Sequence, residues 1–417
     1  MKFVKLKDLL VETKDGEWGK DEPVNEDDIK VAVIRGADFK NIRVNDFSAV
    51  PMKYVPKRKV ERKALKEGDI LIETAGGTAT RPTGRTAIVK RRHLQNGPVL
   101  CASFARYMRP NVEMILPDYL YWYLQYLYTI GEMARNQVQH TGVARFQFTQ
   151  FSNNTYIPVP EFPYQRKVVS ILNALDEKIE LNNRINKTLE EMAQAIFKSW
   201  FVDFEPFRDG EFVESELGMI PKGWEVVKLS EICTTQYGYT ASAREEPVGP
   251  KFLRVKDINK QNWINWSNVP YVEVDQKNYE KYKLNFGDIV VARMADPGKS
   301  AIIDDDSVDA VFASYLVRLS TDSIERAIYI YYFLKSSLYL HYCEGVIGGS
   351  VQKNMNAKVI TGVNLVLPTK EVLLKFKEII LPLRKQIAAN VKESEQLSTL
   401  RDTLLPKLMS GEIRVPL

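Results

Sequence analysis

Residues 163–202 read PYQRKVVSILNALDEKIELNNRINKTLEEMAQAIFKSWFV, a stretch without glycine whose single proline stands at its first position. Apolar residues recur in alternating steps of three and four, which is typical of one long helix that packs against another helix. One heptad position is occupied by Val168, Leu175, Asn182, Leu189 and Ile196. We predict that the second position of the apolar seam is occupied by Ile171, Lys178, Ile185 and Met192.

The same pattern returns near the end of the chain. Residues 371–410 read EVLLKFKEIILPLRKQIAANVKESEQLSTLRDTLLPKLMS, and an asparagine again lies in the middle of the seam, at Asn390 as at Asn182. A polar residue in this place costs stability but can fix the register of paired helices, so we predict a specified pairing. A locally solvated helix bend is the alternative. The predicted pairing residues are Leu175, Asn182, Leu189, Ile196, Leu383, Asn390, Leu397 and Leu404.

The segments before the two helices are repeated as well, which indicates a chain built from two similar halves. Short strings recur in the same order: Val4-Lys5-Leu6 as Val227-Lys228-Leu229, Gly68-Asp69-Ile70 as Gly287-Asp288-Ile289, and Ala102-Ser103-Phe104 as Ala313-Ser314-Tyr315. We therefore predict an α+β fold with two mixed, strand-rich domains related by a pseudo-two-fold repeat. The predicted boundaries are 1–159 and 206–370 for these domains, and 160–205 and 371–417 for the long helices that separate them.

Composition restricts the function only weakly. The 417 residues carry a formal net charge of +5, which permits a polyanionic partner without requiring one. The cysteines Cys101, Cys233 and Cys343 are odd in number and far apart, which favours a reducing compartment. The charged start predicts no signal peptide, and no apolar stretch is long enough for a membrane span. We therefore expect a cytoplasmic protein without contact to a membrane.

Three boundary segments resemble signatures of the specificity subunit of type I restriction-modification systems. They read AIFKSWFVDF at 195–204, LGMIPKGWEV at 217–226 and LPKLMSGEIRV at 405–415, and the resemblance extends over essentially the whole chain. It implies two target recognition domains that each read half of a bipartite double-stranded DNA site. It also implies antiparallel coiled-coil helices that dock two methyltransferase (modification) subunits, to which restriction subunits can be added. The specificity subunit itself performs no chemistry and needs no cofactor.

Sequence motifs that would carry catalysis are missing. Asp296-Pro297-Gly298-Lys299-Ser300 ends like a phosphate-binding loop, but Arg293 stands where the first glycine is required. A strand is expected to follow this stretch, so a turn is the favoured interpretation. No Asn-Pro-Pro-aromatic methyltransferase motif occurs, and Asp118 lacks the following residues of a nuclease metal site. His93, His140 and His341 have no metal-binding spacing, and each is predicted to be a lone surface side chain.

Two loop regions in each half combine the residue types that read DNA, namely basic groups for phosphates and amides or hydroxyls for base edges. In the first half they lie at 76–85 and 137–147, and in the second half at 293–300 and 348–356. An ordinary polar hairpin or capping loop is the alternative. The candidate DNA-binding residues are Thr78, Thr80, Arg81, Thr83, Arg85, Gln139, His140, Thr141, Arg145, Arg293, Lys299, Ser350, Gln352, Lys353 and Asn354.

The other charged groups permit simpler interpretations. The basic run at 53–63 is either a solvated face or a set of phosphate contacts. Arg35 and Arg254 are expected to form structural pairs with Asp38 and Asp257. For the whole chain, the alternative to a DNA-reading subunit is a coiled-coil interaction protein with two peptide-binding domains. An ATPase or nuclease is disfavoured because the catalytic strings are missing.

Overall fold

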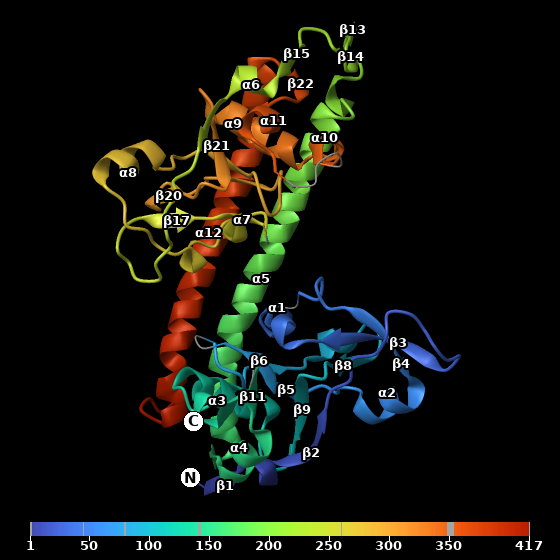
Figure 1. The fold of residues 1–417 in the computed structure, drawn as a ribbon, viewed down its shortest axis with the longest axis vertical. Helices are drawn as coiled ribbons and strands as arrows, with labels where there is room; N and C mark the ends of the chain where they lie inside the picture. The colour runs from blue at the N-terminus through green and yellow to red at the C-terminus, as the bar shows by residue number, and fades with distance from the viewer. Residues whose placement is uncertain are drawn as a thin grey trace. The chain divides into compact units, whose positions relative to one another are not determined.

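Two long helices dominate the computed structural model, which describes residues 2–44, 46–78, 81–140, 143–259, 261–347 and 354–416. They are α5 (Phe162–Phe201) and α12 (Lys370–Ser410), green and red in Figure 1, and they confirm the prediction of one long helix after each repeat. The chain forms two compact units. The first unit contains residues 1–181 and 396–417, and the second contains residues 182–395. Each unit therefore includes a part of both helices.

Short strands form the sheets of the first unit. An antiparallel sheet has the order β2 (Leu10–Asp15), β9 (Ala105–Pro110), β5 (Ile70–Glu73), β7 (Thr86–Ile88). In a second sheet, β3 (Asp28–Ile34) pairs antiparallel with β4 (Met52–Pro56) and parallel with β8 (Val99–Cys101). Strand β1 (Lys2–Lys5) pairs with β12 (Tyr156–Val159), which ends shortly before α5. The aromatic helix α3 (Pro117–Thr129) buries Tyr119 and Trp122 in the core.

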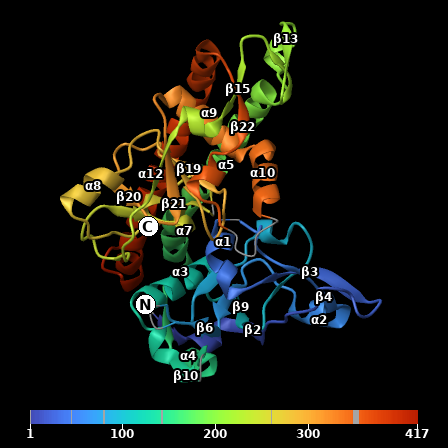
Figure 2. The ribbon, with the colours of Figure 1, turned by 45° about the horizontal axis from the view of Figure 1, so that its top comes forward.

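The second unit, seen together with the first in Figure 2, repeats most of this topology, but an isolated bridge between Lys251 and Tyr271 stands in place of strand β4. Its antiparallel sheet has the order β16 (Thr234–Tyr237), β21 (Leu316–Ser320), β18 (Ile289–Ala292), β19 (Ser300–Ile302). Strand β17 (Lys251–Leu253) is parallel to β20 (Ala310–Phe312), and β15 (Glu225–Lys228) pairs with β22 (Asn364–Leu367). Helix α9 (Ile324–Lys335) takes the place of α3. The predicted α+β class with a repeated, strand-rich domain is thus confirmed.

The repeated Gly-Asp string makes the same turn in both units. Gly68 and Gly287 have φ angles of 85° and 89°, in the left-handed region that glycine adopts most easily. The aspartate after each glycine is buried and accepts a hydrogen bond from a backbone amide three residues earlier, at 2.7 Å for Asp69 and 2.8 Å for Asp288. Each carboxylate also pairs with an arginine on the next strand of its sheet. The weak sequence match therefore marks a shared structural device.

The predicted structural pairs of arginine and aspartate are confirmed. The Arg35 guanidinium donates to Asp38 at 2.9 and 2.8 Å, and the Arg254 guanidinium donates to Asp257 at 2.9 and 3.0 Å. In both cases the carboxylate also accepts the backbone amide of its own arginine. These arginines close a short turn in each unit.

Within each unit, α5 and α12 run antiparallel. Contacts in the second unit join Phe197 to Phe376, Glu190 to Arg384 and Asn186 to Asn390, so residue numbers rise along α5 as they fall along α12. In the first unit, Val168 and Leu172 of α5 share a core with Leu405 and Leu408 of α12, and Asp176, further along α5, pairs with Arg401, earlier on α12. The same direction holds there.

The seam differs in part from the predicted heptads. Asn182 and Asn390 are buried. The six apolar residues predicted with them are half-buried: Leu175, Leu189, Ile196, Leu383, Leu397 and Leu404. The second predicted position is wrong in the second half of α5, because Ile185 and Met192 are 36% and 47% exposed. Asn186 and Ala193, one residue further along the helix, are buried instead. Residues three and four positions after the same residue lie on one face of a helix, so apolar spacing alone does not show which of the two faces the partner helix.

Other predictions can be compared with the fold. In the described part of the chain, no helix is both long and apolar enough to cross a bilayer. The three cysteines are free thiols.

The histidines were predicted to be surface side chains. This prediction is confirmed for His341, which is exposed. It is wrong for His93, which is 5% exposed and accepts a hydrogen bond from the Lys90 amide at 3.1 Å. Burial, together with the nearby cations Arg92 and Lys90, lowers the pKa of His93 from 6.5 to about 4.

Candidate nucleic-acid interface

The two loop regions singled out in the first half meet in one small sheet. Strand β10 (Gln137–His140) pairs antiparallel with β11 (Val143–Phe146), which also pairs with β6 (Ala75–Gly77). The Gln137 side-chain oxygen accepts hydrogen bonds from the amide and hydroxyl of Thr83, at 2.8 and 3.1 Å. Segments distant in sequence therefore form one surface.

Strand alternation sorts the side chains of β11 into two faces. Ala144 and Phe146 are buried, whereas Val143 and Arg145 are exposed. Among the described residues, no ion pair or hydrogen bond occupies the Arg145 side chain, so its guanidinium can meet an external acceptor. Gln139 on β10 is exposed as well. Arg145 and Gln139 thus supply the basic and amide groups that base edges and phosphates require.

The loop before β7 contains residues with different roles. Arg81 and Thr78 are exposed, and the Thr78 amide donates to the Arg81 carbonyl at 2.8 Å. Thr83 is fully buried, and Arg85 donates to the buried carboxylate of Glu73 at 2.9 and 2.6 Å. Thr83 and Arg85 therefore hold the base of the loop instead of presenting free groups to solvent.

Several candidates cannot be placed. Thr80, Thr141, Ser350, Gln352 and Lys353 lie outside the described residues, and the side chain of His140 is not described. The described candidates of the second half are Arg293, Lys299 and Asn354.

The candidates of the second unit also come together. The Arg293 carbonyl accepts a hydrogen bond from the Met355 amide at 2.9 Å, which brings residue 293 next to the segment that begins at Asn354. The Arg293 guanidinium stacks on the ring of Tyr237 at 5.0 Å, and the Tyr237 hydroxyl accepts the Ala357 amide at 3.0 Å. Lys299 and Asn354 are exposed. Sequence reasoning missed Tyr237, because nothing in the local pattern indicates that this strand residue supports Arg293.

The stretch that resembles a phosphate loop is a turn. Strand β19 follows it directly, as predicted, so the helix that a nucleotide cradle requires is replaced by a strand. Gly298 has a φ angle of 87°, and a Cβ atom there would lie 2.9 Å from the Cys343 sulfur. Close packing therefore explains this glycine.

The basic run forms helix α2 (Lys57–Lys63) after strand β4. Lys59 and Lys63 pair with Glu17, each at 3.2 Å. Lys57 and Arg58 are exposed and make no ion pair within the described ranges. Arg62 is exposed and without an ion pair in the same ranges as well, so these three cations are the members of the run best placed for phosphates.

Comparison with known proteins assigns this arrangement to a family. Residues 1–191 and 221–399 match the model of the type I restriction modification DNA specificity domain. The chain belongs to this family. It is a DNA-specificity subunit and not a catalytic subunit, as the sequence resemblance implied.

Relatives of the specificity subunit cover nearly its full length. It is 29% identical over 398 residues to the type I restriction enzyme MjaIX specificity subunit of Methanocaldococcus jannaschii, with 93% of this chain and 89% of the relative covered. It is 26% identical over 420 residues to the HindI specificity subunit of Haemophilus influenzae, with 84% and 88% covered. The S subunit of a type I system from M. genitalium has the same fold, with a TM-score of 0.55, 12% identity, and 98% and 95% covered.

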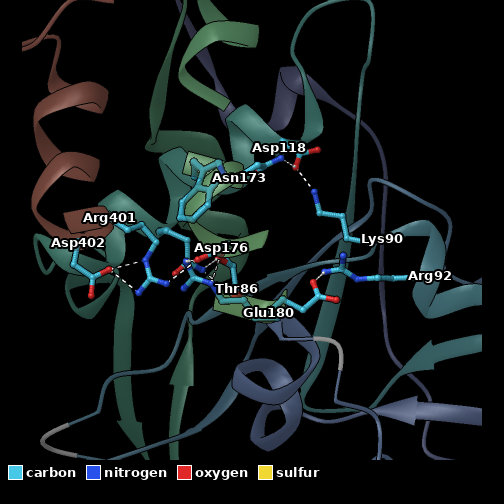
Figure 3. Close-up of polar contacts among 12 residues, drawn as sticks. Thr86, Lys90, Arg92, Asp118, Asn173, Asp176, Glu180, Arg401 and Asp402 are labelled. Atoms are coloured by element: carbon cyan, nitrogen blue, oxygen red, sulfur yellow. Dashed lines mark hydrogen bonds and ion pairs between the residues drawn. The ribbon is translucent and has the colours of Figure 1, made fainter. Parts of the chain in front are cut away.

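A polar cluster connects the strand-rich part of the first unit to the helices of the specificity subunit (Figure 3). Asp176 on α5 pairs with Arg401 of α12 and with Arg43 of helix α1 (Phe39–Arg43), each at 2.7 Å. Glu180, one turn further along α5, is buried and pairs with Arg92 at 2.6 Å. The Arg43 and Arg92 pairs join the strand-rich part to α5, and the Arg401 pair joins the two helices.

A second cluster does the same within the second unit. Arg384 on α12 is 2% exposed, pairs with Glu190 of α5 at 2.8 Å and also pairs with Asp304, just after β19. Its guanidinium lies over the ring of Tyr331 at 5.2 Å. Burial raises the pKa of Asp304, while the Arg384 charge opposes that shift. One buried cation thus connects the two helices and the recognition domain.

Proposed function

We propose that this specificity subunit reads a bipartite target in double-stranded DNA, with residues 1–159 reading one half-site and residues 206–370 the other. The observation that carries the proposal is the repeated topology, in which each unit brings its candidate segments together. The first unit offers Arg81, Gln139 and Arg145, and the second offers Arg293, Lys299 and Asn354. Because these groups differ in type and position, the two domains read different bases.

We also propose that the helices at 160–205 and 371–417 dock two methyltransferase subunits, and that restriction subunits can join them. In the second unit, Ile185 and Met192 of α5 and Ile379 of α12 are exposed. Burial of these apolar side chains under a partner protein would remove apolar area from water and would favour docking. The resulting complex acts on DNA in the cytoplasm.

The test is co-expression with an adenine methyltransferase of a type I system, followed by purification and mapping of methylated adenines. Copurification and one bipartite methylated motif are expected. A chain whose residues 1–159 come from a relative should change one half-site and leave the other intact. If both half-sites change, independent reading by the two domains is refuted; if no methyltransferase copurifies, the docking role is refuted.

A further inference from the structure

Each unit exposes one large aromatic side chain at the tip of a tight turn. Phe104 is 66% exposed between β8 and β9, and Tyr315 is 58% exposed between β20 and β21. The two residues end the repeated strings Ala102-Ser103-Phe104 and Ala313-Ser314-Tyr315. An exposed aromatic ring at the same place in two domains indicates a shared binding role.

The backbone holds both tips in the same way. The Ala105 amide donates to the Ala102 carbonyl at 2.8 Å, and the Leu316 amide donates to the Ala313 carbonyl at 2.9 Å. A glycine lies against each turn so closely that a Cβ atom would come within 2.1 Å of the Ala102 oxygen at Gly16, and within 2.3 Å of the Ala313 oxygen at Gly238. The rings are therefore presented by a rigid backbone, which reduces the entropy lost when they bind.

Both tips adjoin the candidate DNA-reading segments. The Phe104 carbonyl accepts the Thr74 amide at 2.9 Å, and Thr74 directly precedes strand β6. At the equivalent place, the Tyr315 carbonyl accepts the Arg293 amide at 3.0 Å. On the other side of the first tip, Gly16 accepts a hydrogen bond from Lys63 of the basic helix α2 at 2.9 Å. The aromatic tip and the basic groups thus share one edge of the unit.

We propose that Phe104 and Tyr315 pack their rings against the bases of double-stranded DNA, one ring in each half-site. An aromatic ring packs against base faces and thymine methyl groups, or wedges into a base step. Phe104 carries no group that bonds to a phosphate, and the Tyr315→Phe variant separates the ring of Tyr315 from its hydroxyl. The neighbouring arginines and lysines supply the phosphate contacts that bring the ring into the groove. This assignment rests on the proposed DNA-reading function.

The experiment uses the complex with its methyltransferase and a duplex that contains the mapped target. Phe104→Ala and Tyr315→Ala should each weaken binding about tenfold, because the loss of one stacked base contact has about this size. The dependence of the binding constant on salt should stay the same, because neither variant removes a cation. Phe104→Tyr and Tyr315→Phe keep the ring and should bind like the wild type.

Val112→Ala and Met219→Ala are matched controls, because these apolar side chains are 64% and 56% exposed away from the tips. Equal affinity of the alanine variants and the wild type would overturn the proposal, as would a reduced salt dependence. Loss of the methyltransferase from the Phe104→Ala or Tyr315→Ala complex would also overturn it, because the rings would then dock a protein. If the wild-type complex fails to bind the duplex at all, the proposed DNA-reading function fails instead.

Discussion

Asp176 and Arg384 occupy equivalent positions on α5 and α12 but carry opposite charges. Their separation in sequence is the one that relates Asn182 to Asn390, 208 residues. Asp176 pairs with Arg43 and Arg401, whereas Arg384 pairs with Asp304 and Glu190. The strand-rich part of each unit is therefore ion-paired to the helices, but with reversed polarity: the central helix residue is an anion in the first unit and a cation in the second.

Arg384→Met should destabilise the second unit by about 3–5 kcal/mol, because Glu190 and Asp304 lose their buried cation. Glu190 is 1% exposed and cannot recover the loss by contact with water. Denaturant unfolding measures the effect. The control is Lys385→Met on the exposed neighbouring residue, for which little change is expected; equal stability of the two variants would contradict the role of Arg384.

Asn390→Leu should lower stability by about 1–3 kcal/mol, because it leaves the buried Asn186 oxygen without its donor. The Asn390 side-chain amide donates to this oxygen at 2.8 Å. The double variant Asn186→Leu/Asn390→Leu should regain part of the loss, since both polar groups are then removed together. Unfolding of the single and double variants measures the coupling, and additive effects would show that the pair does not act as a unit. An unchanged oligomeric state together with unchanged stability would reject the register role.

Lys57→Ala combined with Arg58→Ala should weaken DNA binding on all sequences and reduce the steepness of the salt dependence by about one unit for each lost phosphate contact. Binding of the assembled complex at several salt concentrations provides the slope. Lys59→Ala is the comparison, because Lys59 already pairs with Glu17 and should have a smaller effect. An unchanged slope in the double variant would show that this helix does not contact phosphates.

The stability of the first unit should fall as the pH drops from 6.5 towards 4. The pKa of His93 is lowered from 6.5 to about 4, so over this range the unfolded chain binds a proton that the folded chain excludes. The stabilisation is complete above pH 6.5 and is lost as the pH approaches the folded value. We expect the unfolding free energy of the His93→Gln variant to fall by about 1–3 kcal/mol less than that of the wild type across this pH range. A parallel pH profile in the variant would contradict this, and His341→Gln on the exposed histidine is the control.

Much of the fold could be predicted because both period and repetition are properties of the sequence. The long helices follow from apolar spacing and the absence of glycine, and the two domains follow from strings that recur in the same order. Burial depends on partners that spacing does not name, so Ile185 and Met192 were placed in the seam instead of Asn186 and Ala193. In the candidate site, Arg145 and Arg85 were both predicted to contact DNA, because each is a basic residue in one of the two loop regions of the first half. Only the fold shows that the Arg85 guanidinium is already paired with the Glu73 carboxylate.

The reversed polarity makes the two recognition domains of this chain different partners for its helices. Lys90 and Asp304 each lie two residues after the equivalent strands β7 and β19, and they too are opposite in charge. Transfer of residues 206–370 into the first place would bring Asp304 towards Asp176 and would remove Arg92 from Glu180. The two recognition domains of this chain are therefore not interchangeable as ion-pair partners of its helices.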